Sequence, residues 1–325
     1  MNYCHPIFIG KYHIYDIFYS NNELVIVTPY IVIPHNVQYI LDENNILTFN
    51  LHKCPHNHTF IYTLNVDYRK NIKLTINNCI IETVVNTYPN FKDEIIFSTI
   101  VKDEDEFIVS WIEYHLRLGI SRFIIYDNSV NLSLSTILDE YIKKNIVVLI
   151  KWTYTYIDQV SGLSGQTTQQ NHSIYAFRDS KYIGLFDVDE YVNIQNMSNI
   201  AGFFEQLIIK EHVDVNKISS FKLLNKCFYN PNNLPVANNQ FFEIFNCDNI
   251  TLNGNEKNFV LPQNTITFSV HIVTSGKPMY AVNNTYAYFN HYVYLNKSSR
   301  GRNKTDLIDN TILRHLHDYT ISNLQ

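Results

Sequence analysis

The feature that most constrains the fold is a regular alternation of strand-like and helix-like segments in the middle of the chain. Short runs rich in β-branched and aromatic residues, typical of buried strands, occupy residues 94–101, 122–129, 146–152 and 182–192. The segments between them are long enough for helices, and in the first of these segments Phe107, Trp111 and His115 fall on one helical face. Strands that alternate with helices indicate a mostly parallel sheet with helices on both faces. We therefore predict an α/β fold for this part of the chain.

The first 88 residues have a different pattern. Short β-branched and aromatic runs, separated by clusters of Asn, Asp and Pro, occupy residues 23–33, 46–51, 60–66, 72–76 and 80–85. None of the segments between them has helical periodicity over a useful length. We predict a small all-β, sandwich-like domain at residues 1–88, followed by an α/β domain at residues 89–325.

Composition and charge narrow the class of protein. The chain is 46% hydrophobic and has a net charge of −5 without a long basic run, so we expect a globular protein that does not bind nucleic acid. No window holds the roughly 18 apolar residues of a membrane span, and the N-terminus lacks a signal-peptide pattern. We therefore predict a cytoplasmic protein. The abundance of Asn, Ile, Lys and Tyr is typical of AT-rich genomes, including viral ones, for which the compartment would be the host cytoplasm.

Three acidic residues interrupt the last of the predicted α/β strands. In an extended chain Asp187 and Asp189 would project from the same face, at a spacing that lets them share a divalent cation. Carboxylate oxygens suit Mg²⁺ or Mn²⁺, and parallel α/β sheets bind ligands at the carboxyl ends of their strands. These residues therefore predict a metal site, and the alternative is a pair of exposed carboxylates where a strand meets a loop.

A late histidine is followed by a group of cations. An imidazole such as that of His291 can complete a metal site begun by two aspartates. Lys297 and Arg300 could then neutralise a diphosphate. The alternative is a strand end followed by a solvated basic loop. His271, which alternates with apolar neighbours, is a second candidate ligand.

Four stretches together resemble glycosyltransferase family 92, of the GT-A, family 2-like type. They are VKDEDEFIVSWIEYHLRLGISRFIIYDNS (101–129), QQNHSIYAFRDSKYIGLFDVDEYV (169–192), VHIV (270–273) and HYVYLNKSSRG (291–301). The resemblance implies a GT-A nucleotide-diphospho-sugar transferase fold, in which the D-x-D aspartates hold the donor diphosphate through Mn²⁺ or Mg²⁺. It also implies inverting transfer of a sugar, from a UDP-linked donor in particular, to a hydroxyl of a glycan or glycoconjugate.

Further donor contacts are expected from strand ends and from the helix predicted around residues 169–178. Asp127 could bond the ribose or base, or instead cap a turn; Lys102 ends the strand that should line the base pocket; and Arg178 could reach the diphosphate. Inverting transfer also needs a base for the acceptor hydroxyl, for which Glu243 and Glu190 are candidates. The strand pleat would turn Glu190 away from its neighbours, which favours a structural role for it.

Two other functions fit part of this pattern. A haloacid-dehalogenase-type phosphotransferase also places its nucleophile in an apolar D-x-D strand, but here the motif follows three strand–helix units. A non-catalytic glycan- or nucleotide-binding protein would retain the fold without the chemistry, and the joint presence of the acidic and basic groups argues against it. We interpret Trp111, Tyr114 and His115 as packing residues.

Overall fold

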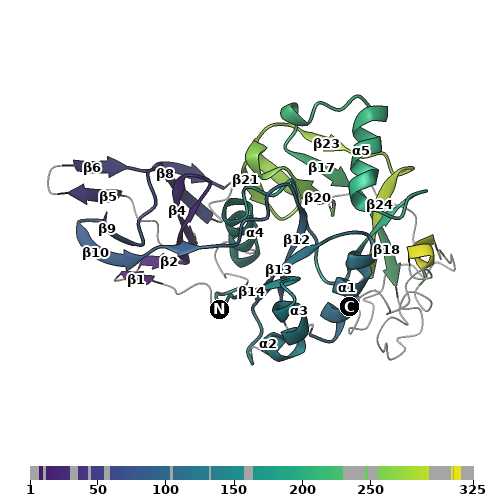
Figure 1. Cartoon of the computed structure of the whole chain (residues 1–325), viewed down its shortest axis with the longest axis horizontal. Helices are drawn as coiled ribbons and strands as arrows, with labels where there is room; N and C mark the ends of the chain where they lie inside the picture. Colours follow the sequence, from purple (N-terminus) through teal and green to yellow (C-terminus); the bar gives the residue numbers. More distant parts are fainter. Residues whose placement is uncertain are drawn as a thin grey trace.

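The computed structural model describes the chain over residues 7–9, 12–29, 36–42, 45–54, 59–102, 105–131, 133–156, 164–229, 246–247, 255–292, 309 and 311–315. In Figure 1 the N-terminal strands lie beside a larger assembly of strands and helices. Over the described residues the chain is therefore a mixed α/β protein.

Every described element before residue 88 is a strand. Five strands form a sheet in the order β11-β3-β4-β8-β7, four form a sheet in the order β10-β9-β5-β6, and β1 pairs with β2. The bounds are β1 (Ile7–Ile9), β2 (Tyr12–Ile14), β3 (Asp16–Ser20), β4 (Glu23–Pro29), β5 (Val37–Asp42), β6 (Asn45–Thr48), β7 (Asn50–Lys53), β8 (Thr59–Asn65), β9 (Asn71–Ile76), β10 (Cys79–Val84) and β11 (Asn86–Thr87). Four of the five predicted runs coincide with single strands, except that residues 30–33 lie outside the described residues. The run predicted at 46–51 instead spans β6 and β7, which belong to different sheets.

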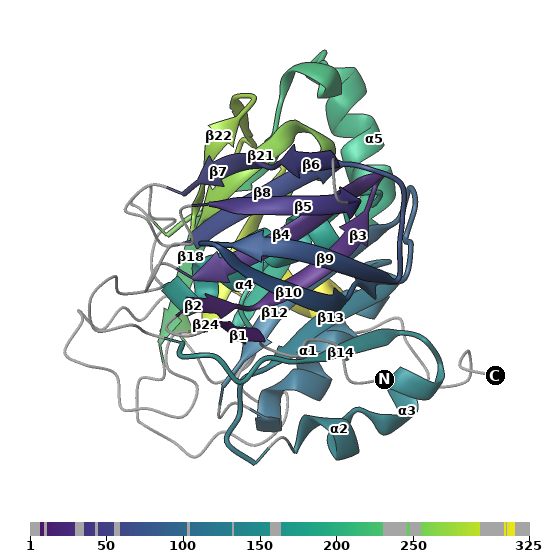
Figure 2. The ribbon, with the colours of Figure 1, turned by 90° about the vertical axis from the view of Figure 1, so that its left-hand side faces the viewer.

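The strand β4 is continuously apolar from Leu24 to Val27 because the five-stranded sheet is buried on both faces. Leu24 and Ile26 pack in a core between the two N-terminal sheets. The alternate residues Val25 and Val27 pack in a second core with residues of β12 and α4. Figure 2 looks through β5 and β9 onto β4 and β8. One core therefore crosses the boundary predicted at residue 88, and the division into two domains stays a prediction.

After residue 94 strands and helices alternate. The main sheet has the order β14-β13-β12-β15-β20-β17-β23, and its first four strands are parallel, as predicted for this part of the chain. β20 joins antiparallel to both of its neighbours. The bounds are β12 (Ile95–Val101), β13 (Arg122–Asp127), β14 (Val147–Lys151), β15 (Tyr182–Leu185), β17 (Ser220–Leu223), β20 (Lys257–Val260) and β23 (Met279–Ala281).

Helices cover both faces of this sheet. On β12, Phe97 and Val101 pack in the core that contains residues of α1 and α5, whereas Ile96 and Ile100 face the core that contains α4. The helices are α1 (Asp105–Arg117), α2 (Leu134–Ile137), α3 (Asp139–Lys143), α4 (Ser164–Ala176) and α5 (Ile200–Lys210). The segment between β13 and β14, which the sequence predicts to be helical, forms two short helices, α2 and α3, which are separated at Leu138.

The helix α4 is buried although most of its residues are polar, because it packs against both the N-terminal strands and the main sheet. Several of its polar side chains bond to neighbouring strands, and Gln169 donates to Ser98 Oγ at 2.9 Å. Asn171 donates to the carbonyl of Phe268 at 2.7 Å and accepts from its amide at 2.9 Å. Phe268 lies on β21 (Thr265–Ser269), which forms a hairpin with β22 (Ile272–Gly276).

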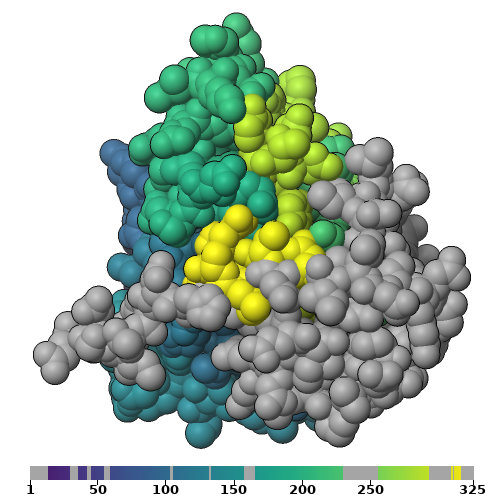
Figure 3. All heavy atoms as spheres, turned by 90° about the vertical axis from the view of Figure 1, so that its right-hand side faces the viewer, coloured from purple at the N-terminus to yellow at the C-terminus, as the bar shows by residue number. Residues whose placement is uncertain are grey.

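A smaller sheet follows the acidic motif. It has the order β16-β24-β18-β19, with bounds β16 (Glu190–Ile194), β18 (Asn225–Tyr229), β19 (Asn246–Cys247) and β24 (Ala287–Tyr292). The 3₁₀ turn η4 (Thr311–His315) packs on β16, where Arg314 donates to Asn193 Oδ1 at 2.8 Å and to the carbonyl of Ile194 at 2.7 Å. Figure 3 shows this turn in yellow at the surface.

Candidate active site

The D-x-D motif lies in a turn between β15 and β16 and not in one continuous strand. The amide of Glu190 donates to the carbonyl of Asp187 at 3.0 Å, and the amide of Asp187 donates to Glu190 Oε2 at 2.9 Å. The expectation of an extended chain across 182–192 was therefore wrong at this point. Phe186 and Val188 are both buried in the turn, so the apolar pattern of the sequence is the same as that of a strand.

A buried lysine neutralises two of the three acids. Lys257, at the start of β20, places its Nζ 2.6 Å from Asp187 Oδ2 and 3.0 Å from Glu190 Oε2. Its side chain is 2% exposed. Burial would lower the pKa of this ammonium, but the two carboxylates hold that pKa well above its ordinary value. Lysines are almost never buried unless they are paired, so this contact stabilises both the cation and the turn.

The pKa values of the two paired acids move in opposite directions. Burial raises the pKa of Glu190 to about 7, against the effect of Lys257. Burial would also raise the pKa of Asp187, but the Lys257 ammonium lowers it below its ordinary value. Asp187 is therefore an ionised partner of the lysine.

The third acid lies beside the predicted histidine ligand. β16 and β24 pair so that Glu190 stands opposite His291. The Nε2 atom of His291 is 3.3 Å from Asp189 Oδ2, and each side chain is 22% exposed. Burial would lower the pKa of His291, but the carboxylate of Asp189 raises it well above its ordinary value. The structure thus brings Asp189 and His291 together at a site that solvent can reach.

This group can hold a divalent metal ion. One donor atom each from Asp189, Glu190 and His291 lie within 4.8 Å of one another. Carboxylate oxygens and an imidazole nitrogen suit Mn²⁺ or Mg²⁺, which usually keep further positions for water or phosphate oxygens. The donor set therefore fits the predicted cation.

Three residues of α1 hold the strand that follows the turn. Trp111 Nε1 donates to the carbonyl of Glu190 at 2.9 Å, and the Tyr114 hydroxyl donates to the carbonyl of Val192 at 2.6 Å. The amide of Val192 donates to His115 Nε2 at 3.3 Å. All three side chains are buried, as expected of packing residues. Their polar atoms additionally fix the backbone of β16, a role that the packing interpretation missed. The signal for it in the sequence was the presence of polar atoms on a buried helix face, because such atoms need hydrogen-bond partners.

A family comparison agrees with this arrangement. The model of glycosyltransferase family 92 matches residues 97–324, which is more than half of the chain. The chain belongs to glycosyltransferase family 92. The family match includes the turn, Lys257 and His291, whereas the strands before residue 88 lie outside it.

Individual relatives of the family 92 chain are distant. A glycosyltransferase family 92 protein of Ricinus communis is 29% identical over 102 residues, which is 31% of this chain and 16% of that protein. The chain therefore matches about a sixth of the length of this curated relative. Solved structures of S. aureus TarS and of its residues 1–349 with UDP are 11% identical, cover 62% of this chain and 37% and 60% of theirs, and have TM-scores of 0.37 and 0.38. These scores are too low to support an argument about the fold.

The carboxyl edge of the family 92 sheet contains two more predicted residues. Val101, Asp127 and Lys151 are register partners at the ends of three parallel strands. Asp127 Oδ1 accepts bonds from the amide and hydroxyl of Ser129, which is the turn cap predicted as its alternative role. Burial raises the pKa of Asp127. Lys102 follows β12 at this edge, and its contact with a nucleotide stays a prediction.

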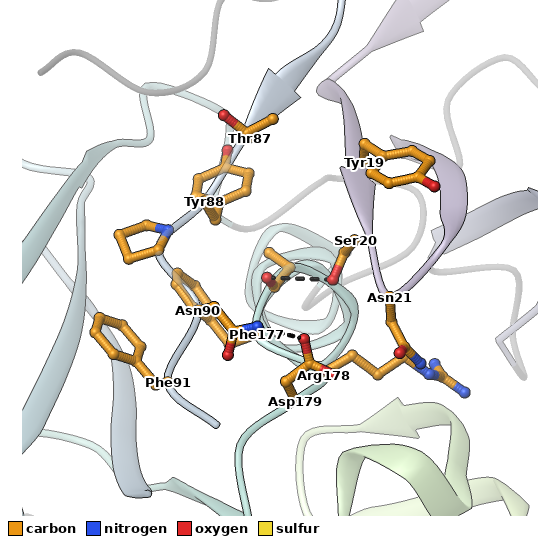
Figure 4. A pocket seen from close by; sticks show the side chains of 12 residues that line it. Tyr19, Ser20, Asn21, Thr87, Tyr88, Asn90, Phe91, Phe177, Arg178 and Asp179 are labelled. Atoms are coloured by element: carbon orange, nitrogen blue, oxygen red, sulfur yellow. Dashed lines mark hydrogen bonds between the residues drawn. The ribbon is translucent and has the colours of Figure 1, made fainter. Parts of the chain in front are cut away.

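Arg178 lies away from the acidic turn. Gln166, near the start of α4, donates to Asp187 Oδ1 at 3.2 Å, whereas Arg178 follows the opposite end of this helix, about 15 Å further along its axis. There it stacks on the ring of Tyr175, 4.7 Å from the centroid, and lines a pocket of about 190 Å³ with Asn21 and Asp179 (Figure 4). This position does not support the predicted contact with a diphosphate.

Four other residues were predicted to belong to the site. Glu243, Lys297 and Arg300 lie outside the described residues. His271 lies in the turn between β21 and β22, where its Nδ1 is 2.9 Å from the carbonyl of Glu256. Among the described residues no helix is long and apolar enough to cross a membrane.

Proposed function

We propose that the chain is an inverting, metal-dependent glycosyltransferase with a GT-A fold at residues 89–325, preceded by the small all-β domain of residues 1–88. It transfers a sugar from a nucleotide-sugar, for which we propose a UDP-linked donor, to a hydroxyl of a glycan or glycoconjugate. Family 92 membership supports this reaction class. The observation that carries the proposal is the pair of solvent-reachable ligands, Asp189 and His291, where a parallel strand ends.

The metal would be held by Asp189 and His291, with the Glu190 carboxyl next to them. When bound, Mn²⁺ or Mg²⁺ would offset the negative charge that develops on the diphosphate leaving group. The chain's own residues hold the ligands in place. β24 sets His291 opposite β16, and α1 fixes the backbone of β16 through three hydrogen bonds.

Glu190 is a poor base for the acceptor hydroxyl. Its side chain is 2% exposed, and its Oε2 faces both the ammonium of Lys257 and the amide of Asp187. A base must reach the proton that it removes, so these contacts favour the structural role. Glu243 is therefore the base that we propose, on the strength of the sequence alone.

The proposal is tested with the purified full chain and a panel of nucleotide-sugars, with Mn²⁺, with Mg²⁺ and with a chelator. We expect release of nucleotide from one donor, dependent on the metal and lost in Asp189→Asn. Asp139→Asn, an exposed acid on α3, is the matched control. Turnover that survives the chelator would contradict the metal requirement. Hydrolysis of an aryl phosphate without any reaction on nucleotide-sugars would favour the phosphotransferase.

A further inference from the structure

Lys257 lies on β20 and contacts the acidic turn, and the sequence alone predicted no role for it. We propose that Lys257 is a positioning residue of the donor site, which holds Asp187 and Glu190 so that Asp189 and His291 remain for the divalent cation. This inference rests on the proposed function and deepens it. Three observations support it: both carboxylate oxygens of Asp187 already accept hydrogen bonds, the site has a net negative charge, and Lys257 lies on a strand that is paired on both sides.

Both carboxylate oxygens of Asp187 accept from the protein. Oδ2 lies 2.6 Å from the ammonium of Lys257, and Oδ1 accepts from Gln166 Nε2 at 3.2 Å. Glu190 Oε2 is likewise shared between Lys257 and the amide of Asp187. A carboxylate whose oxygens already accept strong hydrogen bonds has less to gain from a metal ion, because those bonds would have to break.

Asp189 is in a different position. Its carboxylate faces His291, another candidate ligand, and not a lysine; both side chains are 22% exposed and that of Asp187 is 38% exposed, so the two aspartates differ in their partners and not in their burial. Its backbone is fixed separately, because its carbonyl accepts from the amide of Tyr292 at 2.9 Å. The side chain of Asp189 can therefore turn to a cation without loosening the turn.

The charges support the same division. With all carboxyls ionised and His291 neutral, as a metal ligand must be, the three acids of the turn and the ammonium of Lys257 leave a formal charge of −2. One divalent cation balances this charge. Without the lysine the neighbouring acids would repel one another, and the site would draw a cation towards Asp187 as well.

The lysine is held on a rigid element. β20 pairs with β15 on one side and with β17 on the other, where Lys257 stands opposite Leu223. A strand that is paired on both sides keeps the ammonium in a fixed position relative to the end of β15, where the turn begins. Such a position suits a residue that sets the geometry of its neighbours.

The test measures binding of Mn²⁺ alone to the full chain by electron paramagnetic resonance. We expect Asp189→Asn to weaken binding at least about tenfold, because it removes a ligand. We expect Asp187→Asn to weaken binding by no more than about threefold, through the lost charge alone. Equal losses in the two variants would overturn the inference while leaving the proposed function intact. A wild-type chain that binds no Mn²⁺, with or without UDP, would instead overturn the proposed metal site and the inference with it.

A second variant tests the lysine itself. In Lys257→Met the released Asp187 and the added negative charge should tighten Mn²⁺ binding about fivefold or more, while binding of UDP with Mn²⁺ weakens. The double variant Asp187→Asn/Lys257→Met should return the Mn²⁺ affinity to that of Asp187→Asn. A lysine that only supports the fold would leave the Mn²⁺ affinity of Lys257→Met unchanged or lower it, which would contradict the inference. If Lys257→Met does not fold, the Asp187→Asn comparison decides, because that variant keeps the lysine.

Discussion

Two ionic clusters among the described residues differ in how completely the protein satisfies them. The first joins the N-terminal strands to α4 and is closed. Asp16 on β3 accepts from Asn86 at 2.6 Å, from the Tyr88 hydroxyl at 2.5 Å, and lies 2.8 Å from His172 Nε2. The other nitrogen of His172 is 2.7 Å from the hydroxyl of Tyr126. Burial would raise the pKa of Asp16, but these partners, His172 above all, lower it.

The second cluster, at the acidic turn, is closed on one side and open on the other. The carboxylates of Asp187 and Glu190 are paired with Lys257, although the Asp187 side chain is 38% exposed, whereas Asp189 faces another candidate ligand, His291. A closed cluster stabilises a junction between elements, and an open one has ligand atoms to offer. The same helix serves both clusters, since His172 and Gln166 both lie on α4. The difference predicts that damage to the first cluster reduces stability, and that damage to the open side of the second reduces activity.

The largest effect is expected at the closed cluster. Asp16→Asn removes the charge from a fully buried pair and should lower the free energy of unfolding by about 3–5 kcal/mol. Urea denaturation measures it. The exposed pair Lys73–Glu82 supplies the control, because Glu82→Gln should cost less than about 1 kcal/mol. If Asp16→Asn were as stable as the wild type but no longer bound a donor, the first cluster would serve binding and not stability, which would contradict the comparison.

At the open cluster the expected loss is catalytic. Asp189→Asn should reduce nucleotide-sugar turnover on the order of 100-fold, because the charge that develops on the leaving group would lose its counter-charge. The melting temperature should stay close to that of the wild type, since the Asp189 side chain is partly exposed. Steady-state kinetics and a thermal melt of the same sample separate the two effects. If Asp189→Asn did not fold, the Asp189 side chain would be required for stability, as we expect of Asp16, and the comparison would fail.

A neutral histidine near the turn predicts a pH effect on stability. His115 Nδ1 is 2.9 Å from the carbonyl of Trp111 and its Nε2 accepts from Val192, so burial lowers its pKa to about 3. The unfolded chain binds a proton near pH 6.5 and the folded chain does not, so this stability is complete above pH 6.5 and is lost as the pH falls towards 3. At pH 5.5 the loss should be about 1.4 kcal/mol.

The check is urea denaturation of the wild type and of His115→Gln at pH 7.5 and 5.5. Other histidines titrate in both proteins, so the difference between the two pH dependences isolates His115. Identical pH dependences would show that His115 is protonated in the folded protein.

The smallest effect is expected at α1, which is bonded to the strand that follows the turn. Tyr114→Phe removes the hydrogen bond to the carbonyl of Val192 and should cost about 1 kcal/mol. Amide hydrogen exchange should then speed up in β16 more than elsewhere. Tyr286→Phe removes an exposed hydrogen bond to Glu211 and is the matched control. Equal exchange in the two variants would mean that α1 does not hold this strand.

Much of the fold follows from local patterns in the sequence. Runs of β-branched and aromatic residues located many of the strands before residue 195, and a helical period located α1, because burial on one face of a helix leaves a periodic trace. The carboxylates inside an apolar run marked the turn, since such groups need a compensating partner. The turn conformation was not predictable, because Phe186 and Val188 are buried in it as they would be in a strand.

Two other features depend on distant partners. Lys257 lies 70 residues from Asp187, and a lone lysine before an apolar run has the sequence pattern of a solvated strand end. The polar helix α4 is buried only because sheets far apart in the sequence enclose it. No local pattern could reveal either of these features, because the compensating atoms come from other elements.

A crystal grown with Mn²⁺ and UDP, measured at the manganese absorption edge, tests the central claim most directly. We predict an anomalous peak between Asp189 and His291 with diphosphate oxygens beside it, while Asp187 stays on Lys257. A peak shared by Asp187 and Asp189 with the lysine turned away would contradict the account of the lysine. The absence of a peak at the turn, with UDP bound elsewhere, would contradict the site itself.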